Sequence, residues 1–95
     1  MIIKAKVQTI YGAAYTRRLC KHFAHKIPAV ADGNRGTIEF PFGACSIDCD
    51  KNYMKISVVL NDPGEADRAE KVVGDHLLRM ANKDEPVVSW RREPN

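Results

Sequence analysis

Long apolar runs are missing from this sequence, and no stretch approaches the ~20 residues that a transmembrane helix needs. Residues 1–6 also lack the charged segment followed by an apolar segment and a cleavage site that marks a secretory signal peptide. At 95 residues, the chain is too short for separate cofactor and substrate domains. These absences predict a cytoplasmic protein with a single domain over residues 1–95.

A strong excess of charge of one sign is absent as well. The chain carries 15 Lys and Arg against 12 Asp and Glu, a formal net charge of +3. This is well short of the concentrated positive charge of a dedicated nucleic-acid binder. Aromatic residues make up only 7% of the chain, and none is interleaved with the basic residues Arg17, Arg18 and Lys21 of the first predicted helix. Nucleic acid is therefore not an expected partner.

Cysteine is scarce, odd in number and unsuited to a disulfide framework in a chain without an export signal. Cys45 and Cys49 would share one face of a strand at roughly 13 Å, too far apart to bridge each other or to hold one metal ion. Because Ile47 has the same parity, both cysteines are expected to be small buried hydrophobes. No Cys-x-x-Cys pair, nucleophile elbow or glycine-rich phosphate loop supports another chemistry.

Hydrophobic periodicity predicts both strands and helices along the chain. Alternation of apolar and polar residues indicates half-buried strands, and apolar residues at four-residue steps indicate amphipathic helices. The order is βαβββαβ, which predicts an α+β domain with a mostly antiparallel sheet and both helices packed on one face. The predicted strands are 2–10, 37–42, 44–49, 53–60 and 87–90, the helices 13–26 and 63–81, the main loop 31–36 and the frayed C-terminal tail 91–95.

The second helix has a clear predicted start. Asp62 is expected to be its N-cap, Pro63 its first residue and Glu65 the partner in a capping box.

Two histidines on the first helix lie beside its apolar face. With Leu19 at the centre of that face, His22 falls about 60° to one side and His25 a further 60° round. Residues three apart are neighbours on a helix, so His22 and His25 are a candidate pair of ligands for one metal ion. Cys20 points about 100° the other way and does not converge with them.

The second helix repeats the arrangement. With Val73 at its centre, His76 lies about 60° to the side and Arg79 lies beyond it. Two helices on one sheet face would bring His22 and His76 together along their seam, with Trp90 beneath. Three imidazoles with an open position would suit zinc, iron or copper.

Two other roles for the histidines stay open. A flank histidine often hydrogen-bonds a backbone carbonyl or a carboxylate, and Asp75, Asp62 and Glu39 are candidate partners. His22 and His76 are also candidates for acid–base chemistry on a small substrate.

A basic strip formed by Arg17, Arg18 and Lys21 lies on the face of the first helix opposite Leu19. It is a candidate contact for phosphates, an acidic partner or an anionic ligand, and the alternative is a solvated helix face. Leu78, on the polar side of the second helix, is a candidate contact for a homodimer.

The chain resembles a small bacterial family known only as domain of unknown function 2218. The resemblance rests on Tyr15, the Leu-Cys-Lys-His-Phe-Ala-His-Lys run of 19–26, the His-Leu-Leu-Arg-Met-Ala run of 76–81 and Trp90. Phe23 and Met80 stand where the family has tryptophan and another aromatic residue. The resemblance implies a compact α+β domain with no established activity. It also implies an association with siderophore-interacting and iron-uptake proteins.

The leading hypothesis is a non-catalytic accessory or binding protein in iron metabolism. His22, His25 and His76 would bind or orient a metal ion, metal chelate or partner, and Arg79 would meet an anionic group. Iron or zinc would be the cofactor, although a protein without any cofactor fits the sequence equally well. The alternatives are a small enzyme that uses His22 and His76 as acid and base, and an interaction module whose histidines brace the fold.

Overall fold

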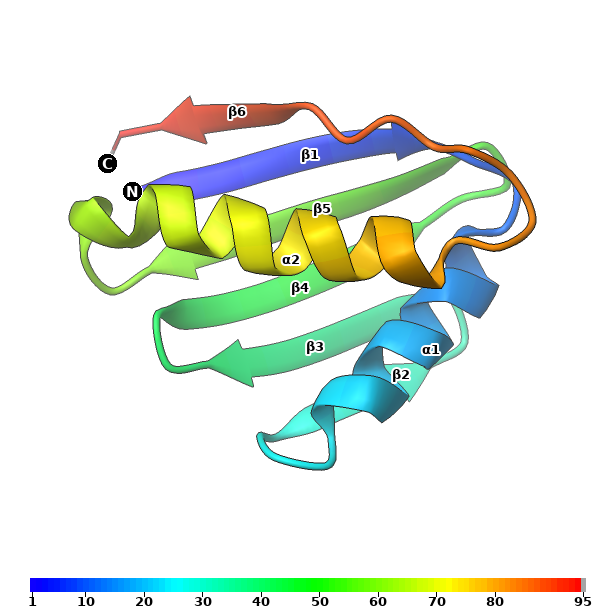
Figure 1. Ribbon diagram of the computed structural model, residues 1–95, viewed down its shortest axis with the longest axis horizontal. Coiled ribbons are helices and arrows are strands. Elements are labelled where there is room, and N and C mark those ends of the chain that lie inside the picture. The colour runs from blue at the N-terminus through cyan, green and yellow to red at the C-terminus, as the bar shows by residue number, and fades with distance from the viewer. Residues whose placement is uncertain (95) are drawn as a thin grey trace.

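The computed structural model describes residues 1–94, which form one antiparallel sheet and two α-helices. The sheet has the strand order β2-β3-β4-β5-β1-β6. Figure 1 shows α1 and α2 on the same face of this sheet, so the predicted α+β architecture is confirmed. The elements are β1 (Ile2–Gln8), α1 (Gly12–Phe23), β2 (Ala29–Asp32), β3 (Arg35–Phe40), β4 (Gly43–Cys49), β5 (Tyr53–Leu60), the 3₁₀ turn η1 (Pro63–Glu65), α2 (Ala66–Met80) and β6 (Trp90–Glu93).

The core lies between the sheet and the helices. Strands β3 and β4 alternate strictly between exposed and buried residues, because successive side chains point to opposite faces of a sheet. Cys45 and Cys49 are 2% and 7% exposed and lie on the buried side with Ile47, so their prediction as small buried hydrophobes is confirmed. The helices contribute their apolar faces, in which Leu19 and Val73 are fully buried.

Strand β2 was not predicted, and the expected loop over 31–36 is wrong. Asp32 pairs with Arg35, which leaves Gly33 and Asn34 as a two-residue hairpin turn. Gly33 has φ +60°, the conformation that a II′ turn requires at its first central position and that glycine adopts without steric cost. The polar residues that suggested a loop are therefore the turn and edge of a short hairpin.

Both helices have boundaries that differ from the predicted ones. α1 ends at Phe23 rather than Lys26, and the amides of Lys26 and Ile27 both bond to the Phe23 carbonyl. Pro28 follows directly, and the residue before a proline is driven away from helical geometry. At α2, Asp62 Oδ1 accepts the Gly64 N–H at 2.9 Å, as expected of an N-cap, but η1 precedes the regular helix.

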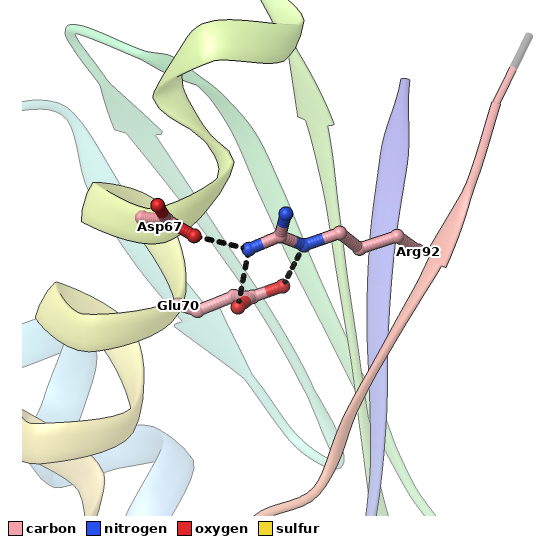
Figure 2. Close-up of polar contacts among 3 residues, drawn as sticks. All are labelled: Asp67, Glu70 and Arg92. Carbon is pink, nitrogen blue, oxygen red and sulfur yellow. Dashed lines mark hydrogen bonds and ion pairs between the residues drawn. The ribbon is translucent and has the colours of Figure 1, made fainter.

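The last strand is displaced by three residues from its predicted position. Strand β6 begins at Trp90, and Arg91 and Arg92, expected in a frayed tail, pair with Lys4 and Ile3 of β1. Asn95, the end of that predicted tail, lies outside the described residues. On the helix side of the sheet, Figure 2 shows the guanidinium of Arg92 bonded to the carboxylates of Asp67 and Glu70 on α2, which fixes this later strand against the helix.

This clamp ties the C-terminal strand to α2 by charge as well as by the sheet. Arg92 Nε and Nη2 donate to the two oxygens of Glu70 at 2.8 and 3.0 Å, and Nη2 also donates to Asp67. Hydrogen bonds to these two carboxylates raise the pKa of Arg92 further above its ordinary value. A bidentate arginine–carboxylate pair fixes geometry more tightly than a single ion pair.

We predict that Arg92→Met frees β6 without unfolding the domain. Methionine keeps much of the apolar stem but removes the donors, so backbone amides over 90–93 should exchange hydrogen a few-fold faster. Arg91→Met is the matched control, because the ion pair of the Arg91 side chain is with Glu93 of its own strand, at 3.4 Å, and not with α2. Hydrogen exchange followed by NMR measures both variants. Equal exchange rates in the two variants would contradict the clamp.

Candidate functional site

Two of the predicted site histidines meet in the seam between the helices. His22 lies in the last turn of α1 and His76 in the second half of α2. Their ring centroids are 5.3 Å apart with an interplanar angle of 43°. The helical-wheel prediction that the two helices bring these side chains together is therefore correct in its geometry. His22 is exposed and His76 is partly buried, so the pair is accessible to solvent.

An aromatic base supports the two histidines. The ring of Phe23 lies 5.2 Å from His22 and 4.9 Å from His76, and packs edge-on at 4.8 Å against Phe40. Phe40 stacks in turn on Phe42 at 4.7 Å, and both are buried. The pair thus lies against an aromatic surface that continues into the core.

Trp90 is not beneath the histidines, contrary to the sequence expectation. Its indole Nε1 approaches α2 at Gly74, where an added Cβ would lie only 3.3 Å away. Gly74 and His76 are two residues apart, about 200° round the helix. Trp90 and His76 therefore pack on opposite sides of α2.

The hydrogen bonding of His76 fixes its tautomer. His76 Nδ1 lies 2.6 Å from the carbonyl oxygen of Val72, four residues earlier on α2. A carbonyl only accepts, so Nδ1 carries the proton in this bond and Nε2 is left as an acceptor in the neutral ring. The Nε2 lone pair of His76 is therefore available to bind a metal ion.

His25 and Arg79 are not drawn into a three-ligand site. His25 lies beyond the end of α1 in an exposed turn, so the helical spacing from His22 no longer applies. Within residues 1–94 no three His, Cys, Asp or Glu side chains converge in a way that could hold a metal ion. Arg79 is exposed on α2, three residues after His76 and on the same side of the helix.

The basic strip has one member with a structural role. Arg18 Nη1 donates to the carbonyl oxygen of Met80 at 3.1 Å, which satisfies a free carbonyl at the C-terminus of α2. Arg17 and Lys21 are exposed on the outer face of α1. Arg18 therefore joins the two helices, and contact of the strip with an anion or partner stays a prediction.

The cysteines offer no nucleophile near the histidines. All three are free and buried. Burial raises the pKa of Cys20, Cys45 and Cys49, so that the unreactive thiol form is favoured.

Sequence reasoning missed the aromatic base of the seam. Alternation along β3 places Phe40 on the core side with Ile38, so its burial was readable. Its contact with Phe23 depends on the angle at which α1 crosses the sheet, for which the sequence carries no local signal.

Residues 4–91 match a family described as uncharacterised proteins conserved in bacteria, DUF2218. Among solved structures, the NMR structure of PA4090 from Pseudomonas aeruginosa matches with a TM-score of 0.74 and 29% sequence identity, over 96% of each chain. No functionally curated protein matches the chain. Neither helix within residues 1–94 has the length and apolar character of a membrane span. Because the family match covers nearly all of its length, the chain belongs to the bacterial DUF2218 family.

Proposed function

We propose that this chain is a non-catalytic binding protein of the bacterial cytoplasm that holds a metal ion or metal chelate at His22 and His76. The observation that carries the proposal is the fixed orientation of His76. Its Nδ1 bonds to the Val72 carbonyl, and its ring lies 5.3 Å from that of His22. Metal-binding histidines almost always donate their second ring N–H in this way, to a carbonyl or carboxylate.

Two imidazoles make an incomplete coordination sphere. A structural zinc site is closed by four protein donors, so this pair would leave positions for water or for atoms of a chelating molecule. Such an open site suits a protein that carries or passes on a metal chelate. Arg79, three residues from His76, would then meet negative charge on the chelate.

Imidazole binds iron, copper and zinc, and does not choose among them by itself. The resemblance to this family implies an association with siderophore-interacting and iron-uptake proteins, and on that implication we propose iron as the metal and those proteins as partners. His25 is not part of this proposed set, because it lies outside the seam.

Metal titration of protein purified without an affinity tag tests the proposal. We expect stoichiometric uptake of zinc or ferrous iron by calorimetry, and a shift of the Nε2 signals of His22 and His76 in ¹⁵N NMR spectra. His76→Ala and His22→Ala should each weaken binding by at least about tenfold. His25→Ala is the matched control and should bind as the wild type does.

Two outcomes would contradict the proposal. The first is a wild-type protein that takes up neither metal and binds no ferric siderophore. The second is a His76→Ala variant with a lower melting temperature but unchanged metal affinity, which would assign the histidine a bracing role alone.

A further inference from the structure

The uncovered face of the sheet is hollowed and lined by cations. Both helices lie on the other face (Figure 1). Because side chains alternate along a strand, every second residue of β1, β4 and β5 points away from the core. A hollow of about 750 Å³ lies there, with Lys4, Lys6, Lys55 and Arg91 among its lining residues. Its volume is in the ~300–1,000 Å³ range of small-molecule sites.

Strand register arranges part of this lining as a row. Arg91 pairs with Lys4, Lys4 with Ser57, and Ser57 with Ser46, across four adjacent strands. Neighbouring strands are about 4.8 Å apart, so the row spans about 14 Å. The row thus has two cations at the β6 end, followed by two serine hydroxyl groups, which can donate or accept hydrogen bonds.

A second row places like charges side by side. Lys6 and Lys55 are direct cross-strand partners on the same face, an arrangement that is unfavourable without a balancing charge. Lys6 Nζ lies over the ring of Tyr53, 4.2 Å from its centroid, and forms no ion pair with the described residues. An anion between the two ammonium groups would remove this repulsion.

Carboxylates only partly balance these cations. Asp48 is the one carboxylate among the lining residues; it is the cross-strand partner of Lys55 on β5 and lies 3.8 Å from Arg35. Outside the lining, Glu93 lies 3.3 Å from Lys4 and 3.4 Å from Arg91, and Asp50 lies 3.7 Å from Lys55. Exposed pairs of this kind are weak, so the cations can turn to a bound anion at little cost.

We infer that this hollow binds a small oxyanion ligand with two or more negative groups, either phosphoryl or carboxylate. One group lies between Lys4 and Arg91, the other between Lys6 and Lys55, and the serine hydroxyls contact the part between them. The site is on the opposite face of the sheet from His22 and His76. Binding of an oxyanion in the hollow therefore does not depend on metal binding at the seam, and each can be tested without the other.

Titration of ¹⁵N-labelled protein with pyrophosphate, and separately with citrate, tests this site at low ionic strength. We expect saturable shifts of the amides of Lys4, Ser46 and Ser57 with at least one of the two probes. Stronger binding of pyrophosphate assigns a phosphorylated ligand, and stronger binding of citrate assigns a polycarboxylate. Lys55→Gln and Lys6→Gln should each raise the dissociation constant about tenfold and leave the melting temperature within a few degrees.

Lys71→Gln is the matched control, because Lys71 is an exposed lysine of α2 paired with Asp75 at 3.4 Å. It should leave the dissociation constant unchanged. Shifts that do not saturate, or that Lys55→Gln and Lys71→Gln reduce equally, would show general attraction to basic residues and overturn the inference. Binding of duplex DNA or an acidic peptide without binding of either small anion would overturn it as well.

Discussion

Tyr15→Ala is expected to lower the free energy of unfolding by about 3–5 kcal/mol, the usual cost of deleting a buried aromatic side chain. Tyr15 is fully buried in α1, and its hydroxyl group donates to Asp84 and accepts the backbone N–H groups of Lys83 and Asp84, both at 3.1 Å. Thr9 donates to the same carboxylate at 2.7 Å. This one side chain therefore holds the connection from α2 to β6 against α1. Urea denaturation measures the loss.

Tyr15→Phe separates the ring from the hydroxyl group. The ring still fills the core, but the two backbone N–H groups lose their acceptor and the Asp84 carboxylate keeps only the bond from Thr9, which costs about 1–3 kcal/mol. Tyr11→Phe is the matched control, because Tyr11 lies beside Tyr15 with ring centroids 6.1 Å apart and is only partly buried. It should change stability by less than about 0.5 kcal/mol. A Tyr15→Phe variant as stable as the control would show that the connection is held by packing alone.

Most of the fold could be predicted because the sheet has one buried face. Alternation in segments such as 53–60 reports that face directly, and β5 has the predicted bounds. The errors lie where local patterns compete with tertiary contacts. Residues 87–90 are rich in β-formers, yet β6 starts at Trp90, because the Arg92 clamp and the pairing with β1 select the later register. The four residues of β2 are too few to show a period.

The candidate site was predictable only in part, for a related reason. Helical geometry relates residues within one helix, so it placed His22 and His76 on flanks that face a common seam. Helical geometry gives no information on the distance between two helices. The 5.3 Å between the His22 and His76 rings depends on how both helices pack on the sheet. The failure at His25 is local, since α1 ends at Phe23, before the expected i, i+3 relation is formed. The cationic hollow depends on strand register, which single-strand patterns do not contain.

Alkaline pH is expected to destabilise the domain through its buried cysteines, with Cys45 as the largest contributor. Burial, with a smaller effect of the nearby Cys20 thiolate, raises the pKa of Cys45 from its ordinary value of 9.0 to about 12. Between these two values the unfolded chain has lost the thiol proton and the folded chain has kept it. The unfolded state then binds fewer protons, so the free energy of unfolding falls by about 1.4 kcal/mol per pH unit, about 4 kcal/mol in all.

This stabilisation is fully present below pH 9 and is lost as the pH rises through about 12. Since small domains have only about 5–15 kcal/mol of stability, unfolding should begin within that window. Tyr15 adds to the loss above pH 10, because burial and the bond to Asp84 raise its pKa from 10.0.

Urea unfolding at pH 8–11 tests this prediction. The free energy of unfolding should fall less steeply with pH for Cys45→Ala than for the wild type, whatever stability the variant loses at pH 8. Equal slopes would mean that the folded state takes up the Cys45 thiolate without penalty, which a side chain 2% exposed between sheet and helices should not allow.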